Sequence, residues 1–216
     1  MTELTDEAKV LITKAIDGHN AADAALDRLY YLLFNQSGDN RSVVALSQRD
    51  PAWSADVLGF STHGQTIGSY GCAITALAMW LNFVTPQAGY TPRSVNEAMK
   101  EKGGYAWDIN HTDRNLVNWS ALNYIFPQLV FNGKIDCPNS PAPLNVVDAM
   151  LDKHLPVMVW VKYPGVPQHF VLLTLKRTTT YDIANPWTGT MQTLTPQYGA
   201  TPSQAICGVV QLAERV

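Results

Sequence analysis

Apolar residues recur at three- and four-residue spacing over residues 3–35, with a break at Gly18-His19-Asn20. This period is typical of helices that bury one face. Asn20 is a good cap for the second helix. We therefore predict an N-terminal helical hairpin with a linker, residues 1–42. The hairpin either packs on the neighbouring domain or docks a protein partner.

The next part of the chain, from residue 43, also has a helical pattern. An apolar run over 73–81 follows what we expect to be a flexible loop at 64–70. Proline and glycine residues mark further helix starts and stops, and Asn145 is a candidate cap. The predicted helices are the one that begins at Cys72 and those over 92–102, 113–124 and 145–153.

After Pro156 the pattern changes to short apolar runs that are rich in β-branched and aromatic residues, which predicts strands. Strands that follow helices along a chain are typical of an α+β domain with a mostly antiparallel sheet. We predict one such domain over 43–216. The predicted strands cover 157–161, 170–175, 182–184, 191–194 and 206–212.

Composition narrows the function classes. The 216 residues carry a net charge of −3, and only 15% of them are charged. The lack of a basic surplus argues against nucleic acid as a partner. The acidic N-terminus has no long apolar stretch, so we expect no signal peptide and no membrane partner. The expected localisation is cytoplasmic as synthesised, with release by lysis or on a virion as further routes.

The chain has three cysteines, Cys72, Cys137 and Cys207. None has the short spacing to another cysteine or histidine that is typical of a metal site, so we expect no metal and no cofactor. Cys72 differs from the others because it is predicted to begin a helix. Helix N-termini present N–H groups and partial positive charge, so a lowered pKa and a nucleophilic thiolate are expected there.

A catalytic cysteine needs a base, a group that orients the base, and donors for an oxyanion. His169 opens an apolar strand, a rigid position that suits a general base. Asn185 lies 16 residues further on, a spacing that lets a returning strand face His169; Asp182 is the alternative orienting residue. Gln48 offers a side-chain amide for the oxyanion.

The order of these residues resembles that in papain-like cysteine peptidases. It is most similar to the bacteriocin-processing branch, which cleaves after double-glycine leaders. The resemblance covers residues 44–212 and is most specific around Cys72. The matching segments are Gln48–Trp53, Tyr70–Met79, Pro92–Asn96, Gly103–Tyr105, His169–Leu172 and Asn185–Gly189.

The resemblance implies a papain-like fold and assigns a role to each residue. Cys72 would be the nucleophile and His169 the base, while Asn185 would orient the imidazole and Gln48 would complete the oxyanion hole. Many relatives have aspartate at the position of Asn185, whereas papain itself has asparagine.

The expected function is therefore hydrolysis of amide bonds in a peptide substrate. The alternatives are a phage or bacterial lysin that cuts peptidoglycan peptides, and a non-catalytic binding or virion domain that keeps the fold. We expect the segments 48–72 and 103–113 to form the substrate groove. Their aromatic residues either line the groove or pack in the core: Trp53, Tyr70, Tyr105 and Trp107.

Overall fold

The computed structural model describes residues 41–163 and 166–215. The chain divides into two compact units, Met1–Ser42 and Val43–Val216. The predicted helical hairpin lies outside the described residues, so the fold below is that of the second unit.

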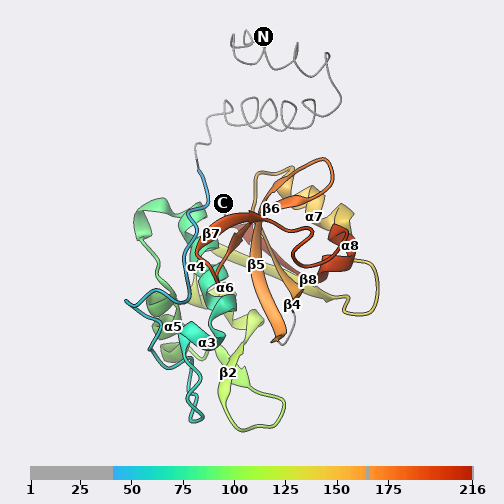
Figure 1. Cartoon of the computed structure of the whole chain (residues 1–216). Coiled ribbons are helices and arrows are strands. Elements are labelled where there is room, and N and C mark those ends of the chain that lie inside the picture. The colour runs from blue at the N-terminus through green and yellow to red at the C-terminus, as the bar shows by residue number, and fades with distance from the viewer. Residues whose placement is uncertain (1–40, 164–165, 216) are drawn as a thin grey trace, which may run out of the picture. The chain divides into compact units, whose positions relative to one another are not determined.

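A six-stranded antiparallel sheet forms the centre of this unit (Figure 1). Its strands lie in the order β3-β8-β4-β5-β6-β7, and every neighbouring pair is antiparallel. The predicted α+β class with an antiparallel sheet is confirmed. The strands are β3 (Leu129–Asp136), β4 (Val157–Tyr163), β5 (Val166–Lys176), β6 (Tyr181–Asn185), β7 (Thr190–Thr193) and β8 (Ile206–Glu214). A separate hairpin pairs β1 (Tyr105–Trp107) with β2 (Arg114–Val117).

Helices flank the sheet. The predicted helices at Cys72, 92–102 and 145–153 are present as α4, α5 and α7. The α-helices are α3 (Ile67–Tyr70), α4 (Cys72–Val84), α5 (Pro92–Glu101), α6 (Leu122–Ile125), α7 (Leu144–Leu151) and α8 (Pro202–Ala205). Two short 3₁₀ helices are η1 (Pro86–Ala88) and η2 (Trp119–Ala121).

Three local predictions were wrong. The helix expected over 113–124 is strand β2 followed by η2 and the start of α6, because this segment pairs with β1. The loop at 64–70 contains α3, whose first turn is stabilised by a capping box between Thr66 and Ser69. Helix α7 is preceded by Pro143, so Asn145 lies inside the helix and does not cap it.

Strand β4 shows why the sheet is buried on both faces. Successive side chains of a strand point to opposite faces. Met158 belongs to one apolar cluster and Trp160 packs against it, whereas Val157, Val159 and Val161 belong to a second cluster. This accounts for the continuous apolar run in the sequence.

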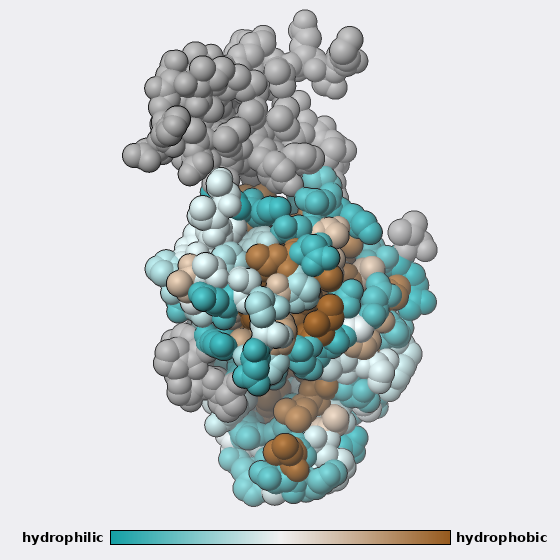
Figure 2. Space-filling model, turned by 90° about the vertical axis from the view of Figure 1, so that its right-hand side faces the viewer, coloured by the Kyte–Doolittle hydropathy of each residue, from teal (hydrophilic) through white to brown (hydrophobic). Residues whose placement is uncertain are grey.

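Each apolar cluster fills the space between the sheet and its helices. Helices α4 and α5 contribute to the first cluster, with α4 packed against β5. Helix α7 packs on β4 and β5 in the second cluster. The face of the molecule in Figure 2 is largely hydrophilic, with its apolar side chains in small patches. Among the described residues, no helix has the length and apolar character needed to cross a bilayer.

Candidate active site

Cys72 occupies a tightly defined position at the first turn of α4. Gly71 ends α3 and also precedes α4, and its N–H donates to the carbonyl of Ile67 at 2.8 Å. A Cβ atom at Gly71 would lie only 2.5 Å from that carbonyl oxygen. The junction between the two helices therefore requires glycine, and it determines where the thiol projects.

The half-buried Cys72 thiol lies against the backbone of Phe170, the residue after His169 in β5. Burial raises the pKa of this thiol, while hydrogen bonds from the backbone N–H groups of Phe170, Ala73 and Cys72 lower it. The net direction is upward. The expectation of a lowered pKa was wrong, because the desolvation of the thiolate outweighs the N–H groups at the helix start.

His169 is buried in β5 and makes a direct contact with Asn185, the last residue of β6. Its Nε2 lies 3.0 Å from Oδ1 of Asn185. Burial lowers the pKa of His169, and the hydrogen bond to Asn185 opposes this shift. The imidazole is therefore neutral at neutral pH.

The hydrogen-bond network around Asn185 defines which way its amide faces. Its Nδ2 donates to Oε1 of Gln192 at 2.9 Å and to the hydroxyl of Tyr198 at 2.8 Å. Its Oδ1 accepts the backbone N–H of Trp187 at 3.0 Å. Because Oδ1 can only accept, the proton of the neutral imidazole belongs on Nε2 of His169.

The alternative orienting residue, Asp182, has a different role. Its carboxylate accepts two hydrogen bonds from Arg177, at 2.5 and 2.6 Å. Tyr198 instead supports the site, since its ring stacks on that of His169 with 6.0 Å between the centroids. Sequence reasoning missed Tyr198 and Gln192, because neither lies in a motif and their contacts depend on the fold.

Gln48 connects the loop after Asn185 to the helix before Cys72. Its backbone N–H donates to the carbonyl of Pro186 at 2.8 Å. Its buried side chain donates from Nε2 to the carbonyls of Gly68 at 3.0 Å and Ile67 at 3.4 Å. The structure thus brings the segments that carry Gln48, Cys72, His169 and Asn185 together.

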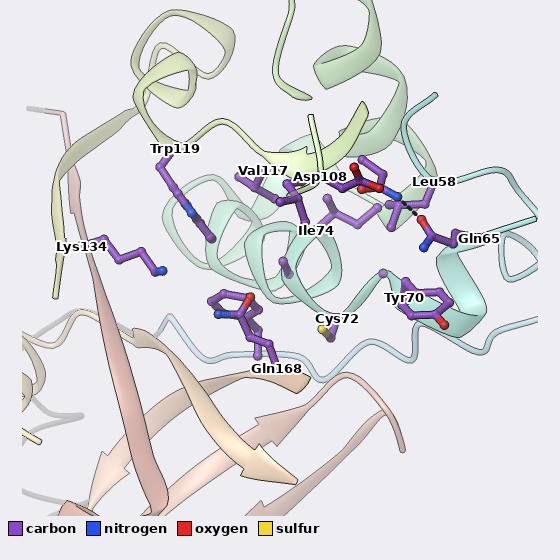
Figure 3. A pocket seen from close by; sticks show the side chains of 15 residues that line it. Leu58, Gln65, Tyr70, Cys72, Ile74, Asp108, Val117, Trp119, Lys134 and Gln168 are labelled. Carbon is purple, nitrogen blue, oxygen red and sulfur yellow. Dashed lines mark hydrogen bonds between the residues drawn. The ribbon is translucent and has the colours of Figure 1, made fainter. Parts of the chain in front are cut away.

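A cleft of about 390 Å³ opens beside Cys72 (Figure 3). The Cys72 sulfur lies at one edge of the cleft, and the side chains of Trp119 and Lys134 extend into it. Most of the walls are apolar. The lining residues are Leu58, Gln65, Tyr70, Gly71, Cys72, Ala73, Ile74, Asp108, Asn115, Leu116, Val117, Trp119, Lys134, Gln168 and Phe170.

Both predicted wall segments contribute to this cleft. Of the four candidate aromatic residues, one lines the cleft and three do not. Tyr70 lines it. Tyr105 is buried and donates a hydrogen bond to Asn96, and Trp53 donates to the carbonyl of Ser47. Trp107 is half-exposed outside the cleft lining.

A buried carboxylate joins two walls of the cleft. Asp113, next to β2, accepts hydrogen bonds from Oγ of Ser61 at 2.7 Å and from the backbone N–H of Thr62 at 2.7 Å. Nδ1 of His63 lies 3.1 Å away. Burial alone would raise the pKa of Asp113, but these hydrogen bonds bring it well below its usual range.

Within residues 41–163 and 166–215, no three side chains of histidine, cysteine, aspartate or glutamate are grouped as a metal site would require. Comparison of the sequence with models of protein families and with curated proteins found no match. The functional assignment therefore depends on the geometry of the site.

Proposed function

We propose that this chain is a cysteine peptidase with a papain-like fold, which hydrolyses amide bonds through Cys72, His169, Asn185 and Gln48. The observation that carries the proposal is the hydrogen bond between Nε2 of His169 and Oδ1 of Asn185. The thiol of Cys72, at a helix start, accepts a hydrogen bond from the backbone N–H of Phe170, the residue after His169.

The reaction starts from a neutral pair. Burial raises the pKa of Cys72 and lowers that of His169, so the thiol and the imidazole are both uncharged at rest. Because Nε2 carries its proton toward Asn185, Nδ1 is the basic nitrogen of His169. It takes the thiol proton as Sγ of Cys72 attacks the substrate carbonyl, and Oδ1 of Asn185 stabilises the imidazolium.

The tetrahedral oxyanion needs donors that are already in position. The backbone N–H of Cys72 lies at the start of α4, where N–H groups have no partner within the helix. Nε2 of Gln48 would be the second donor once the substrate displaces the longer of its two bonds, the one to the carbonyl of Ile67 at 3.4 Å. His169 then protonates the leaving amine, and water hydrolyses the thioester to release the acid and restore the thiol.

The cleft indicates what the enzyme binds. Its size falls in the range of ligand pockets, and Leu58, Ile74, Val117 and Phe170 give it apolar walls. A bulky apolar side chain of a peptide substrate fits this environment, because it buries apolar area on both partners.

Cys72→Ala is the direct test, with Cys137→Ala as the matched control at a buried cysteine outside the site. Purified variants are assayed on a peptide library and on peptidoglycan, with cleavage followed by mass spectrometry. We expect Cys72→Ala to lower cleavage by at least about 10³-fold and Cys137→Ala to retain it. Equal cleavage by wild type and Cys72→Ala would contradict the proposal.

A further inference from the structure

Arg49 directly follows Gln48 and presents an exposed guanidinium beside the site. The centre of this group lies 4.8 Å from the ring centroid of Trp187, which is cation–π distance. Trp187 in turn donates its backbone N–H to Oδ1 of Asn185. Trp187 therefore connects Arg49 to Asn185, the partner of His169.

The backbone around Arg49 is held in place by its neighbours. The N–H of Arg49 donates to Oγ of Ser47 at 3.1 Å, and the N–H of Gln48 donates to Pro186 at 2.8 Å. Gly189, with φ of +68°, approaches so closely that an added Cβ would lie 2.7 Å from Cβ of Ser47. The position of the arginine relative to the loop after Asn185 is therefore well defined.

The guanidinium is not neutralised within the described part of the chain. Two other arginines there do have carboxylate partners: Arg93 pairs with Asp56 and Arg177 pairs with Asp182. The neighbouring Asp50 accepts the backbone N–H of Ala52 and forms no ion pair with Arg49 among the described contacts. The contact with Trp187 uses no hydrogen bond of the guanidinium, so its N–H groups can bind a carboxylate with two hydrogen bonds.

We propose that Arg49 binds a carboxylate of the substrate on the leaving-group side of the scissile bond. This inference rests on the proposed function. The leaving amine must lie next to His169, which protonates it, and Trp187 contacts Asn185 through its backbone and Arg49 through its ring. Neither lines the apolar cleft. A substrate with one side chain in the cleft thus extends its leaving group toward Arg49.

The carboxylate could belong to the C-terminus of a short leaving group or to an acidic side chain. Three peptides with the same acyl part distinguish these sources. Their leaving groups end in a free carboxylate, in an amide, or in an amide after a glutamate. The kcat/KM of each peptide is measured for wild type, Arg49→Ala, Arg49→Glu and Arg49→Lys, with Lys153→Ala as the control that removes an exposed positive charge elsewhere.

We expect wild type to favour one carboxylate peptide over the neutral amide by about 10-fold to 100-fold, the range for hydrogen bonds to charged groups. This ratio should fall toward one in Arg49→Ala, drop below one in Arg49→Glu, recover in part in Arg49→Lys, and remain unchanged in Lys153→Ala. The preferred peptide identifies the source of the carboxylate.

Three results would overturn the inference, and the first two are distinguishable from the third. Wild type that cleaves all three peptides equally would leave the peptidase function in place and remove the role of Arg49. The same holds if wild type shows a preference that Arg49→Ala retains. Absence of any Cys72-dependent cleavage would overturn the proposed function and the inference together.

Discussion

At the residue scale, the neutral amide of Asn185 distinguishes this site from one with a carboxylate behind the histidine. An amide oxygen accepts the Nε2 proton and orients the ring, but it adds no negative charge. A carboxylate would raise the pKa of His169, whereas here burial lowers it. The base is thereby kept unprotonated at neutral pH.

Removing this amide tests its positioning role. We expect Asn185→Ala to lower kcat/KM by about 10-fold to 100-fold, because the buried Nε2 proton of His169 loses its acceptor. Tyr198→Phe keeps the ring that stacks on His169 and removes only the hydroxyl, so its loss should be smaller. Steady-state kinetics at several pH values would show whether Asn185→Ala loses more activity than Tyr198→Phe. Full activity in Asn185→Ala would contradict the role assigned to the amide.

The pH profile tests the neutral pair. A lowered pKa of His169 places the acidic limb of kcat/KM below the ordinary value of 6.5, and a raised pKa of Cys72 places the alkaline limb above 9.0. The rate of alkylation of Cys72 by iodoacetamide should accordingly keep rising, by about tenfold per pH unit, up to at least pH 9.0 without levelling off. A fast, flat alkylation rate from pH 5 upward, measured by mass spectrometry of the modified cysteine, would instead show a thiolate–imidazolium pair at rest.

At the element scale, the β1–β2 hairpin is attached to the loop before α3 through one carboxylate. Asp113 accepts hydrogen bonds from three consecutive residues, 61–63. The N–H of Phe60 also donates to the carbonyl of Arg114 at 2.9 Å. Both segments contribute to the cleft, so this attachment determines the distance between its walls.

Asp113→Asn should destabilise the domain at pH 7, because the hydrogen-bond network loses its charged acceptor. The folded pKa of Asp113 lies below its ordinary value of 3.8, so the contribution is complete above 3.8 and is lost as pH falls through the folded pKa. Urea unfolding from pH 7 to pH 3 should show wild type and variant converging only at the acidic end. Asp152→Asn, at an exposed aspartate, is the control. A constant difference at every pH would contradict this account.

Some elements could be predicted from local pattern alone. The apolar run of β4 and the capping box at Thr91, with Pro92 at the first helical position, each encode their structure within a few residues. Strand β3 was missed because Asn132-Gly133-Lys134 interrupts its apolar pattern, and the structure accommodates this segment with an irregular register against β8. Strand β2 depends on pairing with β1, which propensity cannot show.

The candidate site, like the fold, could be predicted from the sequence only in part. The order of the residues along the chain and the resemblance to papain-like peptidases were sufficient to name four candidates: Cys72, His169, Asn185 and Gln48. The direction of the Cys72 pKa shift was not predictable, because it depends on how much of the thiol is desolvated by β5. The support from Tyr198 also depends on a loop that follows β7 and has no pattern of its own.

At the scale of the whole unit, the cleft lies where the helical layer meets the sheet. Its walls come from α4 and β2 on the helical side and from β3 and β5 on the sheet side. A bulky substrate group would therefore contact both layers at once. Specificity in the cleft should respond to a change of volume without a change of charge.

Val117→Phe tests this expectation. The larger side chain would occupy part of the cleft of about 390 Å³, so the preference should move from bulky to small apolar side chains next to the scissile bond. Val146→Phe makes the same change at a partly buried valine of α7, outside the cleft lining. Cleavage profiles on the peptide library compare the two. An unchanged profile for Val117→Phe would show that the cleft does not hold the substrate.

The position of β8 has a consequence for when the proposed peptidase would become active. This strand is the last in the described chain, yet it lies between β3 and β4 in the interior of the sheet. The sheet therefore cannot close until residues through Glu214 have been synthesised, and such long-range pairings form slowly. A growing chain would already carry Cys72, His169 and Asn185 without the complete sheet that aligns them. The order of synthesis would thus delay the proposed peptidase activity until the whole domain has folded.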